Sequence, residues 1–277
     1  MEKKYLSLRE IQKEELEILK KVIQFFEKNG IQYYIAYGTL LGAVRHKGFI
    51  PWDDDIDLVI ARPEYNRLVE ILKKDNRIAE NIEEIGWEIS NSDSPYLKIV
   101  NKNIAVEAKL AYDTNLWIDI FPLDGLPEKE EDIKQYLKKI EFYRSLFCWK
   151  RSQVRKLKIY SSNKLKKFLK MLITKCFKIV YYNKLIEKYI QYCSKYDFEQ
   201  SEYLDNTIWN WDSSPNKKIN KQLLLQNALY DFEGLKVNGV RDYDTVLKKD
   251  YGNYMELPPE EKRETHEFKA WKVKEEY

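Results

Sequence analysis

The sequence predicts an α+β fold in which a mixed sheet is flanked by helices and a mostly helical region is inserted or appended. Three observations predict it. Segments rich in β-branched and aromatic residues alternate with helical patterns up to residue 127, the stretch that follows is typical of helices, and strand patterns return near the end. We therefore expect a core over 1–127, a basic helical region over 128–200, and a C-terminal segment over 201–277 that packs back on the core.

The first half of the chain gives the clearest signals of secondary structure. A long first helix ends at Asn29-Gly30, which is a good C-terminal stop. Its mostly apolar stripe comprises Leu8, Ile11, Glu15, Ile18, Val22 and Phe25. The segments that follow are predicted as strands at 31–37, 55–60, 96–100, 104–109 and 116–121, and as helices at about 40–46 and 63–74.

The second half is predicted as helices from Glu128 to about Tyr196, followed by a return to mixed structure. Asn238-Gly239 is typical of a hairpin turn. Asp242 is expected to cap a helix that runs to Tyr251 and is stopped by Gly252. No internal repeat or low-complexity linker marks sharp domain boundaries.

Composition limits the classes of function. With 277 residues, of which 44% are hydrophobic, the chain is long enough for a substantial core. A net charge of +3 is too small to indicate a nucleic-acid partner. The three cysteines have no metal-ligand spacing, so neither a disulfide framework nor a zinc site is expected. The first residues lack the apolar core of a signal peptide, and we therefore expect a cytoplasmic protein.

The acidic segment from Asp53 to Asp57 is the strongest indication of chemistry. It leads into a predicted strand, so Asp55 and Asp57 point to one face while Ile56 points to the core. Two carboxylates held this close raise each other's pKa unless a cation lies between them. Mg²⁺ or Mn²⁺ binds carboxylates together with substrate phosphates, and we expect one of them here. A solvated acidic loop is the alternative; an EF-hand is unlikely, because Leu58 stands where that calcium loop needs Gly.

A Gly38-Thr39 turn precedes the acidic segment. Thr39 is expected to cap a short helix, whose unpaired N–H groups, with the Thr39 hydroxyl, favour an anionic oxygen such as that of a phosphate. Many junctions between a strand and a helix share this pattern without binding a ligand. At the end of the same helix, Arg45 and His46 either add positive charge near the phosphate or cap the helix.

A third carboxylate comes from a distant strand. Asp119 is an isolated acid in the apolar run Leu116–Phe121, which Pro122 closes. An unpaired buried carboxylate is costly, so Asp119 is expected to titrate, to pair, or to face a cavity. We predict that it is a general base or an additional metal ligand; the alternative is a structural acid paired with an Arg or Lys.

Together these residues resemble the LicD family of phosphotransferases, which includes the fukutin-like enzymes and belongs to the wider nucleotidyltransferase-fold group. That fold's pattern is a Gly-Ser/Thr turn, then a carboxylate-x-carboxylate strand, then a third carboxylate on a later strand. Gly38-Thr39, Asp55-x-Asp57 and Asp119 match it in order. The resemblance extends through the segments 38–46, 50–57, 117–122, 250–255 and 257–263, and to His266-Glu-Phe268.

The resemblance implies a nucleotidyltransferase-like catalytic core over 1–127. It also implies transfer of phosphocholine from CDP-choline to a sugar hydroxyl of a teichoic acid or related cell-surface glycan precursor, with a lipid-linked glycan as acceptor. In that reaction Asp55, Asp57 and Asp119 would bind Mg²⁺ or Mn²⁺, and Asp119 would accept the proton of the acceptor hydroxyl. Substrate-binding roles are implied for Gly38, Thr39, Arg45, His46 and His266.

A choline head group favours contact with aromatic faces. Trp209 and Trp211, two residues apart in a polar segment, are the first candidates for that contact. Packing in the core is the alternative for both, because aromatic side chains are more often core residues than ligands of a cation.

The segment from Lys150 to Ile186 carries twelve Lys or Arg and no acid. It predicts peripheral contact with an anionic membrane, on the inner face of the plasma membrane, where a lipid-linked acceptor would lie. A solvated helix face that packs its apolar side on the core is the alternative. No stretch is long and apolar enough to cross a bilayer.

Other functions remain open beside phosphocholine transfer. One is a nucleotidyltransferase acting on a small molecule such as an aminoglycoside, which shares the carboxylates but transfers the nucleotide. Another is a polyol-phosphate transferase that uses CDP-ribitol or CDP-glycerol. A metal-dependent binding protein at the membrane is the non-enzymatic alternative, and the complete set of three acids argues against it.

Overall fold

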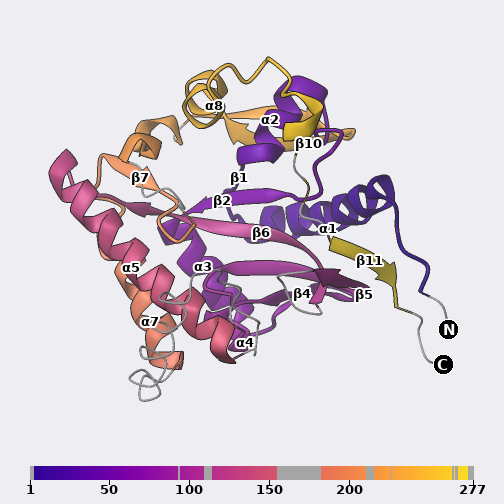
Figure 1. Ribbon diagram of the computed structural model, residues 1–277, viewed down its shortest axis with the longest axis horizontal. Helices are drawn as coiled ribbons and strands as arrows, with labels where there is room; N and C mark the ends of the chain where they lie inside the picture. Colours follow the sequence, from indigo (N-terminus) through magenta and orange to yellow (C-terminus); the bar gives the residue numbers. More distant parts are fainter. Residues whose placement is uncertain are drawn as a thin grey trace, which may run out of the picture.

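The computed structural model describes residues 3–92, 94–108, 114–154, 182–209, 215–224, 226–263, 265 and 268–273. Their architecture is α+β, as predicted: a mixed sheet runs through the middle, flanked by helices (Figure 1). Over these residues the sheet has nine strands, with the main path β1-β2-β6-β5-β4-β3 and with β7, β8 and β11 attached beside it. The strands are β1 (Tyr34–Ile35), β2 (Asp57–Ala61), β3 (Arg77–Ala79), β4 (Ile82–Ile85), β5 (Leu97–Ala108), β6 (Thr114–Gly125), β7 (Tyr203–Asp205), β8 (Ile219–Asn220) and β11 (Phe268–Lys272), and a separate hairpin consists of β9 (Asn227–Phe232) and β10 (Leu235–Val240).

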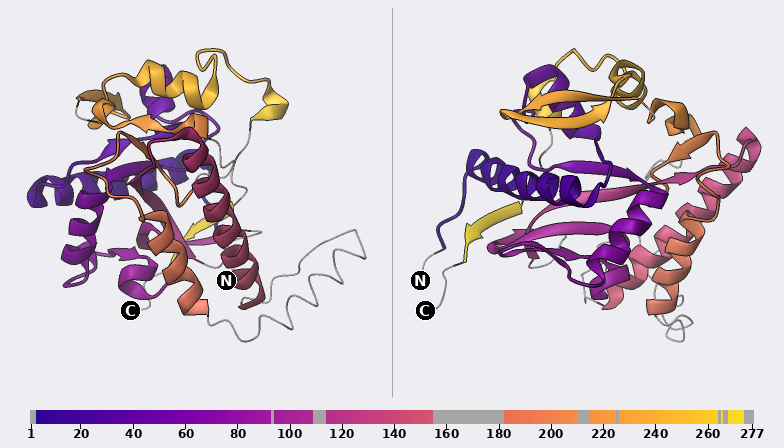
Figure 2. Two further views of the ribbon diagram at one scale, coloured as in Figure 1. Left: turned by 90° about the vertical axis from the view of Figure 1, so that its left-hand side faces the viewer. Right: turned by 180° about the vertical axis from the view of Figure 1, so that it is seen from behind.

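Helices pack around the sheet, and α5 packs beside α7 (Figure 2). Within the ranges given above, none of the helices is both long and apolar enough to span a membrane. The helices are α1 (Leu8–Asn29), α2 (Tyr37–His46), α3 (Arg62–Leu72), α4 (Trp87–Ser90), α5 (Glu130–Val154), α7 (Tyr182–Cys193) and α8 (Tyr243–Tyr251), with short 3-10 turns at Pro215–Lys217, Lys221–Leu223 and Glu260–Lys262.

Helix α1 has defined signals at both ends. Ser7 and Glu10 form a reciprocal capping box at its start, and Gly30 ends it in the left-handed conformation, with φ of 61°. The predicted end of the helix at Asn29-Gly30 is therefore confirmed. The inward face carries apolar side chains but also buries Gln12 and Glu15, two polar residues that lie one turn apart.

The centre of the sheet is the parallel pair β2 and β6. Ile56, Leu58 and Ile60 are fully buried, and this apolar face anchors β2 in the core. The register places Asp57 opposite Asp119. Since side chains at paired positions of adjacent strands point to the same face of a sheet, the two carboxylates lie side by side.

Three predicted elements differ from the structure. The strands expected at 96–100 and 104–109 form one strand, β5, whose register shifts between Asn101 and Ala105. The strand expected at 31–37 is paired only over β1, because α2 already begins at Tyr37. Asn238-Gly239 is not a hairpin turn but lies inside β10; the turn is Glu233-Gly234, where both residues have positive φ.

The C-terminal part of the chain contacts earlier elements. The β9–β10 hairpin packs against α2 and β1, and β11 pairs antiparallel with β5. Tyr5 bridges to Trp271, so both ends of the described chain lie on one side of the molecule (Figure 1). Helix α8 has the predicted Asp242 cap and ends at Gly252. Residues 155–181, in the middle of the basic helical region predicted over 128–200, lie outside the described residues, and the division into three regions stays a prediction.

A glycine on α2 determines how closely the chain returns after that helix. A Cβ at Gly42 would lie 2.4 Å from the carbonyl oxygen of Gly48 and 3.2 Å from the backbone nitrogen of Ile50. Both neighbours are backbone atoms and cannot swing away. The close approach leads the chain from α2 into the acidic segment.

We predict that Gly42→Ala lowers the free energy of unfolding by roughly 1–3 kcal/mol, the usual cost of overpacking. Helix propensity alone would act in the opposite direction, because alanine is favoured over glycine inside a helix by about 1 kcal/mol. Chemical denaturation of both proteins measures the difference. A variant more stable than the wild type would show that the loop after α2 yields to a methyl group.

Candidate functional site

The backbone of Asp57 is fixed by the start of α2. Its N–H donates to Thr39 Oγ1 at 2.9 Å, and its carbonyl oxygen accepts from the N–H of Ala36 at 3.1 Å. On the other side, the N–H of Asp119 donates to the carbonyl oxygen of Ile56 at 3.0 Å. The acidic segment is thus held between α2 and β6, and neither Asp57 nor Asp119 depends on a mobile side chain for its position.

The prediction that Thr39 caps α2 is wrong. The helix begins at Tyr37 and its N-cap is Ala36, so Thr39 is the third helical residue and is buried. The helix begins three residues earlier than the sequence indicated, and Tyr37 takes a positive φ of 48° at its start. Thr39 contributes its hydroxyl to the backbone of Asp57, and thereby orients the second acid of the predicted carboxylate pair.

The first turn of α2 already faces a carboxylate of the protein. A Cβ at Gly38 would lie 2.6 Å from Asp53 Oδ2, so glycine at this position allows Asp53 to approach the helix. A negative charge at the N-terminal end of a helix is favourable. From α1, Gln12 Nε2 donates to the carbonyl oxygen of Asp53 at 2.8 Å. The acidic segment is therefore tied to two helices.

Asp119 is an oriented, ion-paired carboxylate. Lys98 Nζ donates to its Oδ1 at 2.6 Å, and Trp117 Nε1 donates to its Oδ2 at 3.3 Å. The Lys98 ammonium also lies 4.4 Å from the centroid of the Trp117 ring. The pairing with a basic residue that the sequence left open is thus observed, with Lys98 as the partner. It coexists with the position next to Asp57, because both acids share one face of the sheet.

Negative charge accumulates at this edge of the sheet. Burial raises the pKa of Asp57 well above its ordinary value, and the charges of Asp55, Asp119 and Asp53 raise it further, while Lys98 lowers it. Burial also raises the pKa of Glu15, and the negative charges of Asp55 and the other acids of the segment raise it further. The acids therefore form a continuous array that extends from β6 to α1.

The residues fit a divalent cation whose coordination shell is completed by the substrate. Among the described residues, no three His, Cys, Asp or Glu side chains are already gathered as a metal cage. Mg²⁺ does not need one, since it is commonly held by one or two carboxylates together with phosphate oxygens and water. Asp55 and Asp57 can provide those carboxylates, and the charge they concentrate is what a cation would neutralise.

A pocket of about 250 Å³ opens directly beside Asp57. The Trp209 ring stacks on Phe121 with ring centroids 5.9 Å apart, and Tyr37 meets the edge of the same Phe121 ring at 6.2 Å. The Tyr37 hydroxyl accepts a hydrogen bond from Asn206 Nδ2 at 2.9 Å. The lining residues are Tyr37, Asp57, Asp205, Asn206, Trp209, Lys217, Ile219, Asp250 and Tyr251.

Four of the predicted substrate-binding residues, Gly38, Thr39, Arg45 and His46, do not line this pocket. Arg45 donates to the carbonyl oxygen of Tyr254, and His46 packs edge-on against Trp52. A helix rises 1.5 Å per residue, so Arg45 and His46 lie about 10–12 Å along α2 from Gly38. Arg45 attaches the end of α2 to the loop after α8. Trp211 and His266 lie outside the described residues.

Several pocket residues had no distinct signal in the sequence. Tyr37 precedes the Gly-Thr turn and is the last residue of the strand predicted at 31–37. Asp205 and Asn206 lie between the segments that carry the family resemblance. Asp250 and Tyr251 lie in a segment that carried the family resemblance, but no role was assigned to them. Only long-range pairing, here of β7 with β6, brings Asp205 to the site.

Comparison with known proteins gives one family and several relatives. Residues 30–166 match the model of the LicD/FKTN/FKRP nucleotidyltransferase domain. The chain is 29% identical over 268 residues to the lipopolysaccharide cholinephosphotransferase LicD of Haemophilus influenzae, covering 95% of this chain and 97% of that protein. The aligned region therefore includes nearly every element described above.

Two other relatives match over shorter stretches. An uncharacterized protein of Rickettsia prowazekii is 41% identical over 88 residues, which is 32% of this chain and 28% of that protein. The human ribitol 5-phosphate transferase FKRP is 46% identical over 44 residues, which is 16% of this chain and 9% of that protein.

The hydroxyl of Thr39 provides a test of how the site is built. In Thr39→Val the shape is nearly kept, but the buried N–H of Asp57 loses its acceptor, and we predict a loss of roughly 1–3 kcal/mol of folding free energy. Thr39→Ser retains the hydroxyl and serves as the matched control. Urea denaturation of the three proteins measures the effect. Equal stability of the valine and serine variants would mean that the hydrogen bond contributes nothing to holding Asp57.

Proposed function

We propose that this chain, a phosphotransferase that belongs to the LicD/FKTN/FKRP family through its nucleotidyltransferase domain, moves phosphocholine from CDP-choline to a sugar hydroxyl of a teichoic acid or related cell-surface glycan precursor. The observation that carries the proposal is the register of β2 and β6, which sets Asp119 beside Asp57, and Asp57 lines a pocket together with Tyr37, Trp209 and Tyr251. Similarity to a lipopolysaccharide cholinephosphotransferase over almost the whole chain supports the nature of the transferred group.

Asp55 and Asp57 are the residues that would hold Mg²⁺ or Mn²⁺, which when bound supplies positive charge for the donor phosphates and the departing CMP. Their own contribution is positional. Asp57 is fixed through both its N–H and its carbonyl oxygen, so the carboxylate begins the reaction in place. The first turn of α2 adds the positive end of a helix dipole to the same region.

Asp119 is proposed to accept the proton of the acceptor hydroxyl. Lys98 and Trp117 each donate to one of its oxygens, so the carboxylate is held in one orientation. Its neighbour across the strands is Asp57, so the proposed proton acceptor would lie beside a residue that would hold the cation and, through it, the donor phosphates. Proton removal at the attacking oxygen and charge neutralisation at the phosphates can then occur on one face of the sheet.

The pocket provides features that suit a choline head group. Tyr37, Trp209 and Tyr251 give it aromatic walls, and three carboxylates and one ammonium lie among its lining groups. A trimethylammonium group has no hydrogen-bond donors and is attracted to aromatic faces and negative charge. A ribitol or glycerol moiety is neutral and needs hydrogen bonds instead. The lining therefore favours choline over the polyols as the transferred group.

The acceptor is proposed to be a lipid-linked glycan, met at the inner face of the plasma membrane. The basic segment between Lys150 and Ile186 motivates this part of the proposal, through attraction to anionic lipids. A sedimentation assay with vesicles of neutral and of anionic composition tests it. Binding to neither kind of vesicle at low salt would remove membrane contact from the proposal.

We predict that the purified protein releases CMP from CDP-choline when a glycan acceptor and Mg²⁺ are present, and that Asp57→Asn lowers the rate on the order of 100-fold or more, because a charge-stabilising group is lost. Asp119→Asn should lower it by a factor of roughly 10²–10⁴, the usual contribution of a general base. Asp75→Asn is the matched control, since Asp75 is exposed and pairs only with Arg77 among the described residues.

The same assay distinguishes the alternatives when the donor is labelled. With choline carrying the label, the product should retain it; with the cytidine carrying it, the product should not. Retention of the nucleotide would assign the chain to the nucleotidyltransferases that modify small molecules. Turnover of CDP-ribitol or CDP-glycerol in preference to CDP-choline would assign it to polyol-phosphate transfer.

Trp209 tests the head-group pocket separately. Trp209 is 36% exposed, stacks on Phe121 and lines the pocket. We predict that Trp209→Ala raises the KM for CDP-choline by up to about 30-fold, which corresponds to a cation–π contact of up to about 2 kcal/mol. Trp209→Phe keeps an aromatic face and should lose less. Steady-state kinetics of both variants measures the effect. A wild-type KM in both Trp209→Ala and Trp209→Phe would mean that the choline group binds elsewhere.

A further inference from the structure

Glu15 of α1 is a buried acid with one oxygen that has no hydrogen-bond donor among the described residues. Its side chain is 1% exposed, and its Oε2 atom has no partner among the described residues. Buried carboxylate oxygens are normally paired, since leaving one unpaired costs free energy. In a helix whose other inward side chains are mostly apolar, such a residue needs a reason to remain an acid.

The packing of α1 places Glu15 against the acidic segment. Gln12, one turn before it on the same face, donates to the backbone of Asp53 at 2.8 Å. This bond fixes the helix against the start of the segment. Glu15 then lies beneath the residues that follow, and Asp55 is its strongest charged neighbour. The unpaired oxygen is therefore buried on the α1 side of the acidic segment, whose last acid, Asp57, lines the pocket.

We propose that Glu15 is a further carboxylate of the divalent-cation site, lying behind Asp55 and supplying negative charge and a hydrogen-bond acceptor to the bound, hydrated cation. The inference rests on the proposed function, since it concerns the same site. It explains why an acid occupies the inward face of α1 and why its oxygen lacks a donor in the protein. Carboxylates placed around the direct ligands of a metal commonly change its affinity 10–100-fold.

The alternative is that Glu15 acts only in packing. In that case replacement by the isosteric glutamine would leave cation binding unchanged, because volume and shape are conserved. The two readings therefore differ in a quantity that does not involve the transfer reaction. A change in net charge alone could also weaken cation binding, so a control variant that removes a different acid of α1 is needed.

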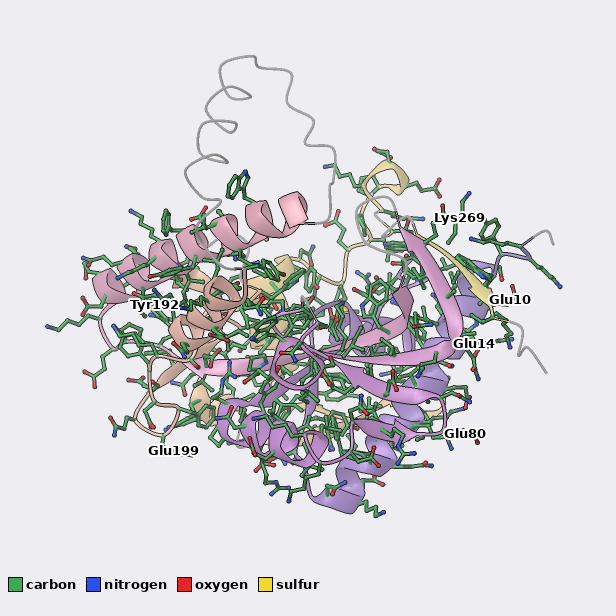
Figure 3. All side chains as sticks on the ribbon, turned by 90° about the horizontal axis from the view of Figure 1, so that it is seen from below. Glu10, Glu14, Glu80, Tyr192, Glu199 and Lys269 are labelled. Atoms are coloured by element: carbon green, nitrogen blue, oxygen red, sulfur yellow. The ribbon has the colours of Figure 1, made fainter. Side chains whose placement is uncertain are left out.

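The control is Glu14, the preceding residue of the helix. Glu14 lies at the edge of the molecule, where it pairs with Lys272 of β11 at 2.7 Å (Figure 3). Glu14→Gln removes the same charge from the same helix without touching the acidic segment. Any general effect of net charge on cation binding is therefore present in this variant too.

The experiment measures Mn²⁺ affinity of the full chain by electron paramagnetic resonance or calorimetry, without substrate, together with thermal unfolding in the absence and presence of Mn²⁺. We expect Glu15→Gln to weaken Mn²⁺ binding by roughly 10-fold or more and to reduce the stabilisation that Mn²⁺ gives, while the metal-free variant unfolds at the wild-type temperature or above. Glu14→Gln should bind Mn²⁺ as the wild type does. Glu15→Asp, which restores the charge, should recover part of the affinity.

Each other result overturns the inference. Wild-type affinity in Glu15→Gln assigns Glu15 to packing and leaves the proposed transferase activity intact. Equal weakening in both glutamine variants assigns the effect to net charge. A metal-free Glu15→Gln protein that is strongly destabilised shows a structural role, and Glu15→Asp then decides whether charge or shape is responsible. If the wild type bound no Mn²⁺ yet released CMP from CDP-choline, the cation site would fail while the transfer reaction remained.

Discussion

The site depends on the parallel pairing of β2 with β6. This pairing joins two segments about 60 residues apart in the chain and sets Asp57 opposite Asp119. A shift of one residue in the register would turn one of the two carboxylates to the other face of the sheet. The apolar residues of the opposite face oppose that shift, since Leu58 and Ile120 are fully buried. Burial of the core thus determines which acids meet.

The cost of this arrangement is concentrated charge. Asp57 and Glu15 both have a raised pKa, first because of burial and then because of neighbouring acids. They bind protons more tightly in the folded chain than in an unfolded one, so their contribution to stability falls as pH rises from the ordinary carboxyl pKa through the raised value. Lys98 offsets part of the negative charge at Asp57, whereas the charges that raise the pKa of Glu15 all belong to acids. In the proposed site, the loss of stability would be exchanged for affinity toward a cation.

The sequence alone predicts those parts of the site that depend on the local pattern of residues. Alternation across Asp55-x-Asp57 and the isolated Asp119 in an apolar strand predicted which acids share a face, and the register agrees for Asp57 and Asp119. Asp55 lies before β2, which begins two residues later than predicted, so its shared face stays a prediction. Contacts between distant segments had no such signal. Lys98 reaches Asp119 only because β5 pairs with β6, and Thr39 bonds Asp57 from inside α2, which begins three residues earlier than its composition indicated. Glycine and threonine at a turn fit several geometries equally well, and the surrounding fold selects one.

One face of β6 links the parts of the site. Trp117, Asp119 and Phe121 alternate along the strand and point to the same side, while the intervening isoleucines are buried in the core. Trp117 orients Asp119, and Phe121, two positions further on, supports the rings of Trp209 and Tyr37. The proposed proton acceptor and the ring that supports Trp209 and Tyr37 of the pocket lining are therefore separated by about 7 Å along one strand. A substitution that alters the pleat of β6 would move both together, so the distance between the proposed phosphate and head-group sites would be set by the backbone and not by side-chain rotamers.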